Sequence, residues 1–237
     1  MTLGPDETVL LQVVPGVAIT ATLAWTWAIM AALTLISAIA GTRLSAGDER
    51  PSRLRTLVEA TVETIRGQIA AIGVKDPDRY LPFVGTLFLF IAAANLLAPV
   101  PGYTPPTASL STTAALALCV LAAVPVFAVT RKGIVGFLRS YLQPTPFMLP
   151  FNIIGELSRT LALAVRLYGN MMSGTVIAAI LLSVAPLFFP VLMQLLGLLT
   201  GMIQAYIFAV LAMVYIASAA AAGGRTGGAS KGDPDGE

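Results

Sequence analysis

The stretch ELSRTLALAVRLYGNMMSGT, residues 156–175, decides the fold, because it places Arg166 in the middle of a segment that is otherwise apolar enough to lie in lipid. A guanidinium at the centre of a membrane helix costs roughly 2.5–3.5 kcal/mol on insertion scales. No acidic residue stands three or four positions from Arg166, so its own helix offers no salt bridge. At 100° per residue, one largely polar face carries Arg159, Leu163, Arg166, Asn170 and Ser173. The sequence therefore predicts a membrane helix whose arginine needs a partner from elsewhere.

The composition is that of an integral membrane protein. Of the 237 residues, 57% are hydrophobic and 11% are charged, whereas soluble domains carry about a quarter charged residues. The formal net charge of +2 is too small to predict nucleic-acid binding. The chain has no histidine, and its single cysteine, Cys119, lies in an apolar run. These counts exclude a disulfide framework, zinc motifs and the classical hydrolase triads.

Five apolar stretches are long enough to form membrane-embedded helices, over residues 17–40, 81–100, 110–130, 151–183 and 191–222. The last two exceed the length of a perpendicular crossing, which predicts strong tilt. The fold class expected is therefore all-α, with a single membrane domain over residues 1–222. The Gly-rich polar segment 223–237 is predicted to be a disordered cytoplasmic tail.

A further helix is predicted over residues 52–72, where charged residues are interspersed among apolar ones. Its apolar residues recur at helical spacing, at Leu54, Leu57, Val58, Val62, Ile65 and Ile69. This pattern is typical of an amphipathic helix that lies on the membrane surface. A solvated helix followed by a loop is the alternative interpretation.

The positive charges predict the orientation. Of the 14 Lys and Arg residues, seven lie between the first two spans, three between the third and fourth spans, and two in the tail. Only Arg159 and Arg166 lie inside membrane segments. By the positive-inside rule, the N-terminus is expected outside the cell and the C-terminus in the cytoplasm.

The last apolar segment carries a matching stripe of residues three or four positions apart: Gln194, Gly197, Gly201, Gln204, Phe208, Leu211, Tyr215 and Ser218. Its GxxxG pattern from Gly197 to Gly201 favours close helix packing. Gln204 is a candidate hydrogen-bond partner for Arg166 across the helix pair. The guanidinium stays protonated at physiological pH, so Arg166 acts only as a fixed positive charge. Such a charge can attract a carboxylate that must release its proton or sodium ion, or it can simply brace the fold. For Arg159, snorkelling to the cytoplasmic surface is the favoured interpretation.

These residues carry a resemblance. The run LALAVRLYGNMMSG, followed by IQAYIFAVLAMVYI, resembles the membrane-embedded subunit a of the F-type ATP synthase, and the similarity extends from about residue 80 to 220 and includes PPTASLSTT. The resemblance implies that Arg166 faces the ion-carrying carboxylates of the rotating c-ring, with Asn170 and Gln204 as polar neighbours in the ion path. It also implies two aqueous half-channels, tilted last helices, peripheral-stalk b subunits as further partners, and the inner membrane of a bacterium as the location.

The departures from the family pattern are specific. Many relatives carry an acid just after the GNxxxG run and a histidine in the last helix, where this chain has Thr175 and Gly197. The usual PPTADLNTT reads here with Ser109 and Ser111 in place of its Asp and Asn. Candidate substitutes in the ion path are Glu156, Ser109, Ser111, Ser173 and Thr175. The pattern looks most like the divergent N-type branch of the family, for which proton and sodium coupling both remain open.

The expected function is ion translocation coupled to ATP synthesis or hydrolysis, without bond chemistry on this chain. It contains no GxxxxGK[ST] loop for a nucleotide phosphate, and we expect no cofactor and no metal. A stand-alone transporter or channel is the competing class, but the sequence shows no repeated halves of the kind such proteins often have. Glu156 keeps two interpretations: an acid at the mouth of an access channel, about 15 Å from Arg166 along the helix, or a structural acid that pairs with Arg159.

Overall fold

The computed structural model describes residues 9–14, 17–45, 53–72, 76–100, 102–142, 147–184 and 189–221. The predicted tail, residues 223–237, lies outside the described residues. Six α-helices make up most of the described part of the chain: α1 Ala21–Ser45, α2 Arg53–Ala71, α3 Pro77–Leu96, α4 Leu110–Leu142, α5 Met148–Val184 and α6 Phe189–Ala221. A short 3-10 helix, η2, covers Pro106–Ala108 between α3 and α4.

Five of these helices contain windows that are long and apolar enough to cross a membrane, at Ala21–Ile39, Pro77–Leu96, Leu110–Arg131, Leu149–Leu181 and Val191–Ala219 in the described residues. The all-α membrane architecture is therefore confirmed. The last two windows hold 33 and 29 residues, which at 1.5 Å per residue extend about 50 and 44 Å. The hydrocarbon core is only about 30 Å thick. Both helices must therefore tilt strongly to remain in it.

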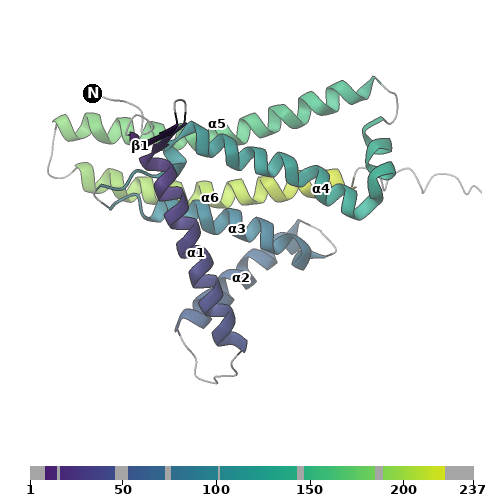
Figure 1. The fold of residues 1–237 in the computed structure, drawn as a ribbon, viewed down its shortest axis with the longest axis horizontal. Helices are drawn as coiled ribbons and strands as arrows, with labels where there is room; N and C mark the ends of the chain where they lie inside the picture. The colour runs from purple at the N-terminus through teal and green to yellow at the C-terminus, as the bar shows by residue number, and fades with distance from the viewer. Residues whose placement is uncertain are drawn as a thin grey trace, which may run out of the picture.

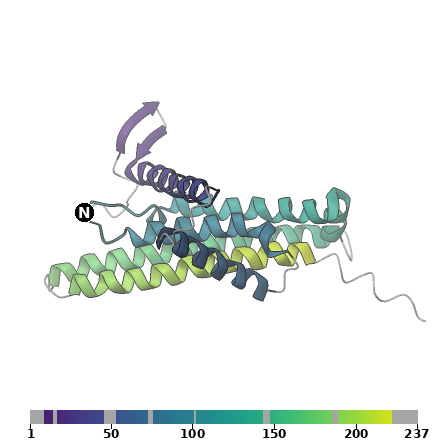
Figure 2. The ribbon, with the colours of Figure 1, turned by 90° about the horizontal axis from the view of Figure 1, so that it is seen from below.

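The arrangement of the helices agrees with this tilt. Figures 1 and 2 show α5 and α6 side by side along the long direction of the molecule, with α1 crossing that direction. The apolar window of α1 holds 19 residues, about the length of a perpendicular crossing. When α1 lies along the membrane normal, α5 and α6 run obliquely through the bilayer.

The chain enters α1 through a β-hairpin that the sequence did not predict. Strand β1, Val9–Val14, pairs antiparallel with β2, Val17–Thr20, so that Val9 lies opposite Thr20. The first helix begins at Ala21, and the prediction that it starts at residue 17 is wrong. The physical reason is local, because Val17, Ile19 and Thr20 are β-branched and favour an extended backbone.

Two other helix boundaries differ from the sequence prediction. Helix α3 begins at Pro77 and ends at Leu96, four residues earlier at each end than predicted. Helix α4 continues to Leu142, past the predicted end at residue 130, and bends at Gly133, where φ is 75°. Only glycine adopts this conformation without a steric penalty. The cationic segment after the third span, with Arg131, Lys132 and Arg139, is therefore helical.

The described core is formed where α3 and α6 cross the other helices. One buried cluster joins residues of α1, α3, α4, α5 and α6, including Ile29, Ile91, Val120, Leu167 and Phe208. A second cluster joins α2, α3, α4 and α6 around Ile69, Tyr80, Val124 and Met213. Because α3, α4 and α6 contribute to both clusters, these three helices join the two clusters into one core.

Helix α2 is the predicted amphipathic helix. Ile69 is buried and Ile65 is half-buried against the second cluster, whereas Glu59, Glu63 and Arg66 are exposed. Arg66 donates to Asp78 at 2.8 Å, which links α2 to the start of α3. The helix itself and its two unlike faces are therefore present as expected, and its position on the membrane surface stays a prediction.

Candidate functional site

The site is organised around Arg166, near the middle of α5. Its neighbours Leu163, Ala164 and Leu167 are buried against α6 and the rest of the first cluster, with exposures of 1%, 4% and 0%. This 3-4 spacing defines the inward face of α5. Arg166 itself is exposed, and it makes no hydrogen bond or ion pair with any described residue. The backbone beneath the cation is therefore fixed by packing, while the guanidinium faces away from the bundle.

Gln204 does not fill the role predicted for it. Its side chain is 4% exposed, and its Nε2 has no hydrogen-bond partner. The predicted hydrogen bond between Gln204 and Arg166 is absent from the described residues, so that prediction is wrong. The physical reason is rotational, because α6 turns Gln204 into the bundle whereas α5 turns Arg166 out of it.

Gln204 lies next to a buried polar connection between three segments. Asn95 of α3 is fully buried, and its Nδ2 donates to the Gly201 carbonyl of α6 at 2.7 Å. Thr107 of η2 donates from Oγ1 to Asn95 Oδ1 at 2.8 Å. Gly201 is one turn before Gln204, so this connection fixes the height of Gln204 against α3. Buried side-chain hydrogen bonds of this kind specify one packing arrangement.

The two glycines of the GxxxG pattern behave differently. A Cβ built at Gly201 would lie 2.9 Å from Asn95 Cβ, so only glycine fits there. A Cβ at Gly197 would meet nothing within 4 Å. Close packing is therefore a property of Gly201 alone, and its neighbour is a side chain of α3 rather than another helix backbone.

Tyr103 supports the same region from the loop between α3 and η2. Its hydroxyl donates to the Ala94 carbonyl at 3.0 Å, and its ring meets Trp25 of α1 edge-on, with centroids 5.0 Å apart. Burial raises the pKa of Tyr103. The phenol therefore stays protonated and remains a hydrogen-bond donor throughout the physiological pH range.

Glu156 lies near the start of α5 and has a partner there. Its Oε1 accepts from Arg159 Nη1 at 3.5 Å, and its side chain is 16% exposed. The Arg159 guanidinium also lies 5.6 Å from the ring centroid of Tyr215 on α6. The Arg159–Tyr215 contact connects the beginning of α5 to the end of α6. The pair with Arg159 agrees with the structural interpretation of Glu156, while the half-buried carboxylate is also compatible with the ion-path interpretation.

The remaining candidates divide between the interior and the surface. Ser109 is 1% exposed and follows η2, whereas Ser111 is exposed on α4. Ser173 and Thr175 are exposed on α5, and their hydroxyls donate to carbonyls of their own helix at 3.1 and 2.9 Å. Asn170 is half-buried, one turn beyond Arg166. The structure does not gather these residues into one cluster.

Asn95 and Thr107 were missed in the sequence. The signal was present, because Asn95 interrupts the apolar run LFIAAANLLA, and a strongly polar residue at membrane depth needs hydrogen-bond partners. Among the described residues, no group of three or more His, Cys, Asp and Glu side chains is placed to hold a metal ion.

The fold and the site define a class: a multi-pass helical membrane protein with a tilted helix pair, in which Arg166 lies at membrane depth and pairs with none of the described residues. Comparisons then identify the family. The sequence profile described as "ATP synthase A chain" matches residues 23–217, and the chain belongs to this family. It is a non-catalytic, ion-translocating subunit of an ATP synthase.

Relatives match over nearly their whole length. The chain is 59% identical to "ATP synthase subunit a 2" of Acaryochloris marina, over 92% of each chain. It is 56% identical to "ATP synthase subunit a 1" of Chlorobaculum parvum, over 92% of this chain and 96% of that one. It is 54% identical to "ATP synthase subunit a" of Albidiferax ferrireducens, over 92% of this chain and 94% of that one. The resemblance noted in the sequence is thereby confirmed.

Proposed function

We propose that this chain is the stationary half of a rotary ion path, in which Arg166 is the fixed charge that faces the carboxylates of a ring of c subunits. One observation carries the proposal: Arg166 is exposed and unpaired among the described residues, although the residues around it are packed against α6. A guanidinium left facing lipid costs roughly 2.5–3.5 kcal/mol. A carboxylate on a neighbouring subunit removes that cost and supplies the missing ion pair.

The mechanism needs a cation that does not move and does not titrate. Packing of Leu163 and Leu167 at 1% and 0% exposure holds the α5 backbone, and a guanidinium stays charged at any physiological pH. As a ring carboxylate approaches Arg166, the positive charge favours its ionised form and so releases the bound proton or sodium ion. The same charge repels free cations and blocks a direct leak between the two sides of the membrane.

The ion reaches the ring by two access paths that end on opposite sides of Arg166. For one path, the buried side chains of Ser109, Gln204 and Asn95 supply uncharged hydrogen-bonding groups inside the bundle. For the other, Glu156 supplies a half-buried carboxylate near the start of α5. Asn170, Ser173 and Thr175, on the same helix as Arg166, are polar positions that the moving ring carboxylates or the entering ion meet. Ser111 is exposed on α4 and lies outside the proposed path.

The charge distribution supports an orientation with the N-terminus outside and the C-terminus in the cytoplasm of a bacterium, in its inner membrane. Seven cationic residues between the first two spans and three between the third and fourth then lie in the cytoplasm. We place the peripheral-stalk b subunits among the partners, since a stationary subunit must be held against rotation.

Replacement of Arg166 by alanine tests the proposal. Arg166→Ala should abolish ATP-driven ion pumping while the complex still assembles, because an exposed side chain contributes little to packing. Arg166→Lys should also impair pumping, since an ammonium is a compact charge that can deprotonate in a low dielectric. The measurement is ATP-driven pumping in vesicles that contain the assembled complex, with the amount of this chain checked by gel.

Leu161→Ala is the matched control, because Leu161 is 64% exposed on the same helix and carries no charge; pumping should persist. Full coupled pumping by Arg166→Ala would refute the role of the arginine. Ion transport by the isolated chain in vesicles, without other subunits, would instead support a stand-alone transporter. Titration of pumping against pH and against sodium in the unmodified complex identifies the transported ion.

A further inference from the structure

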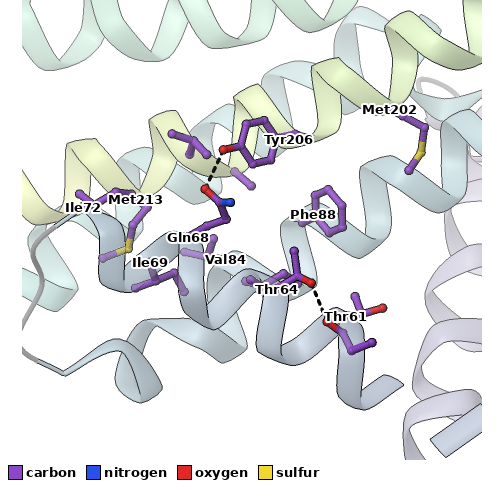
Figure 3. Close-up of a pocket in the computed structure, with 14 residues that line it drawn as sticks. Thr61, Thr64, Gln68, Ile69, Ile72, Val84, Phe88, Met202, Tyr206 and Met213 are labelled. Atoms are coloured by element: carbon purple, nitrogen blue, oxygen red, sulfur yellow. Dashed lines mark hydrogen bonds between the residues drawn. The ribbon is translucent and has the colours of Figure 1, made fainter. Parts of the chain in front are cut away.

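A cavity of about 370 Å³ lies between α2, α3 and α6, away from Arg166. Figure 3 shows side chains from the three helices converging on it. Its wall is largely apolar, with Ile65 and Ile69 from α2, Ile72 just after α2, Val84 and Phe88 from α3, and Met213 from α6. Cavities of about 300–1,000 Å³ with mainly apolar walls are typical of small-molecule sites.

The polar groups of the cavity are few and uncharged. Among the described residues, no Asp, Glu, Lys or Arg lines it. Thr64 donates from Oγ1 to the Ala60 carbonyl at 2.7 Å, and the Tyr206 hydroxyl donates to Gln68 Oε1 at 2.8 Å. The amide nitrogen of Gln68 is turned toward the open space (Figure 3). The cavity therefore suits an uncharged apolar ligand with at most one hydrogen-bond acceptor near Gln68.

The position of the cavity in the fold indicates what adjoins it. The walls from α3 and α6 belong to the apolar windows Pro77–Leu96 and Val191–Ala219. The other face of α2 carries exposed Glu59, Glu63 and Arg66, which belong in headgroups or water. The cavity thus lies directly beneath a surface helix, where its apolar walls adjoin the hydrocarbon of the bilayer. Filling the cavity with water would be unfavourable, because its apolar walls would then be hydrated. The acyl chains of the adjoining lipids are apolar and can fill it without this cost.

We propose that this cavity binds one acyl chain of a membrane phospholipid, which fills the space under α2 and keeps α2 in place against α6. Met202 and Met213 line the cavity, and their unbranched side chains adapt to a flexible chain. The amide of Gln68 donates to the ester carbonyl where the acyl chain meets its headgroup. This inference is independent of the role of Arg166, because the cavity contains none of the proposed ion-path residues.

Photolabelling tests the site. The assembled complex is placed in phosphatidylcholine vesicles whose lipid carries a diazirine in one acyl chain, and after illumination the labelled residues are mapped by peptide mass spectrometry. We expect labelling of Phe88, Met202 and Met213 to exceed that of Leu35 and Ile36 several-fold. Leu35 and Ile36 are exposed on α1 and report the bulk lipid. Equal labelling of the two groups overturns the proposal.

Three variants sharpen the result. Ala60→Phe should reduce labelling of the cavity several-fold, because Ala60 lines it. Ala70→Phe is the matched control, since Ala70 is exposed on the same helix and is not part of the wall. Val210→Phe fills the cavity from α6 and serves where Ala60→Phe fails to assemble. Unchanged labelling in the Ala60→Phe and Val210→Phe variants overturns the acyl-chain site. Cross-linking of the cavity residues to a helix of another subunit, without labelling by lipid, also overturns it.

Discussion

Replacing Gly201 by alanine perturbs the contact that holds α6 against α3. The added Cβ would lie 2.9 Å from Asn95 Cβ and 3.1 Å from Asn95 Cγ. Because Asn95 Cβ is attached directly to the backbone of α3, the two helices must separate to relieve the contact. Overpacking of this kind costs typically about 1–3 kcal/mol.

The same separation weakens a hydrogen bond. Asn95 Nδ2 donates to the Gly201 carbonyl at 2.7 Å in a fully buried position, and loss of such a bond leaves buried groups unsatisfied at about 1–3 kcal/mol. The two effects share Asn95 and are therefore not additive, so we expect a destabilisation of about 2–4 kcal/mol in total. At 1.4 kcal/mol per factor of ten, the lower figure already changes the folded-to-unfolded ratio roughly 30-fold.

The assay heats the purified complex stepwise in detergent and measures how much of this chain remains associated. Gly201→Ala should be lost at a clearly lower temperature than the unmodified chain. Gly197→Ala is the control, because a Cβ there meets nothing within 4 Å and alanine favours a helix over glycine by about 0.5–1 kcal/mol. Equal heat stability of the two variants would refute the close packing of Gly201 on Asn95.

Two further predictions concern the access paths. If Glu156 belongs to the ion path, Glu156→Gln slows ATP-driven pumping and shifts its dependence on pH or sodium; the lost pair with Arg159, whose side chain is 51% exposed, is worth at most about 1 kcal/mol. Pumping measured against pH and sodium decides, and an unchanged profile with intact assembly removes Glu156 from the path. Ser109→Val should slow pumping because it removes a buried hydroxyl, whereas Ser111→Val should not, since Ser111 is exposed. Equal pumping rates in the two serine variants would contradict a path through the interior.

Much of the fold follows from local features of the sequence. Hydropathy located the membrane helices, because each apolar run is at least about as long as a crossing, and helical spacing identified α2. The β-hairpin before α1 escaped notice because the apolar run continues through Val17 and Ile19, and hydropathy alone does not separate a strand from a helix. The bend at Gly133 was missed for a similar reason, since a glycine within a helical run carries no mark of its positive φ.

The candidate site was also predicted only in part from the sequence. Helical periodicity shows which residues of one helix share a face, but it does not show which neighbouring helix that face meets. The spacing placed Gln204 on a polar stripe, yet only the packing of α6 on α3 turns it inward, away from Arg166. Likewise, Ser109 and Ser111 are near neighbours in the sequence, and the tertiary structure buries the first and exposes the second.

The sequence by itself determined that Arg166 lies in an apolar membrane helix without a partner on that helix, because charge and hydropathy are properties of the local chain. Only the tertiary structure decided that Asn95, Thr107 and Gly201 meet in the interior and that no described residue pairs with Arg166. Asn95 and Gly201 are 106 positions apart, and contacts over such a separation depend on how all the helices pack together. The energy of each contact is local, but its existence is a property of the whole bundle.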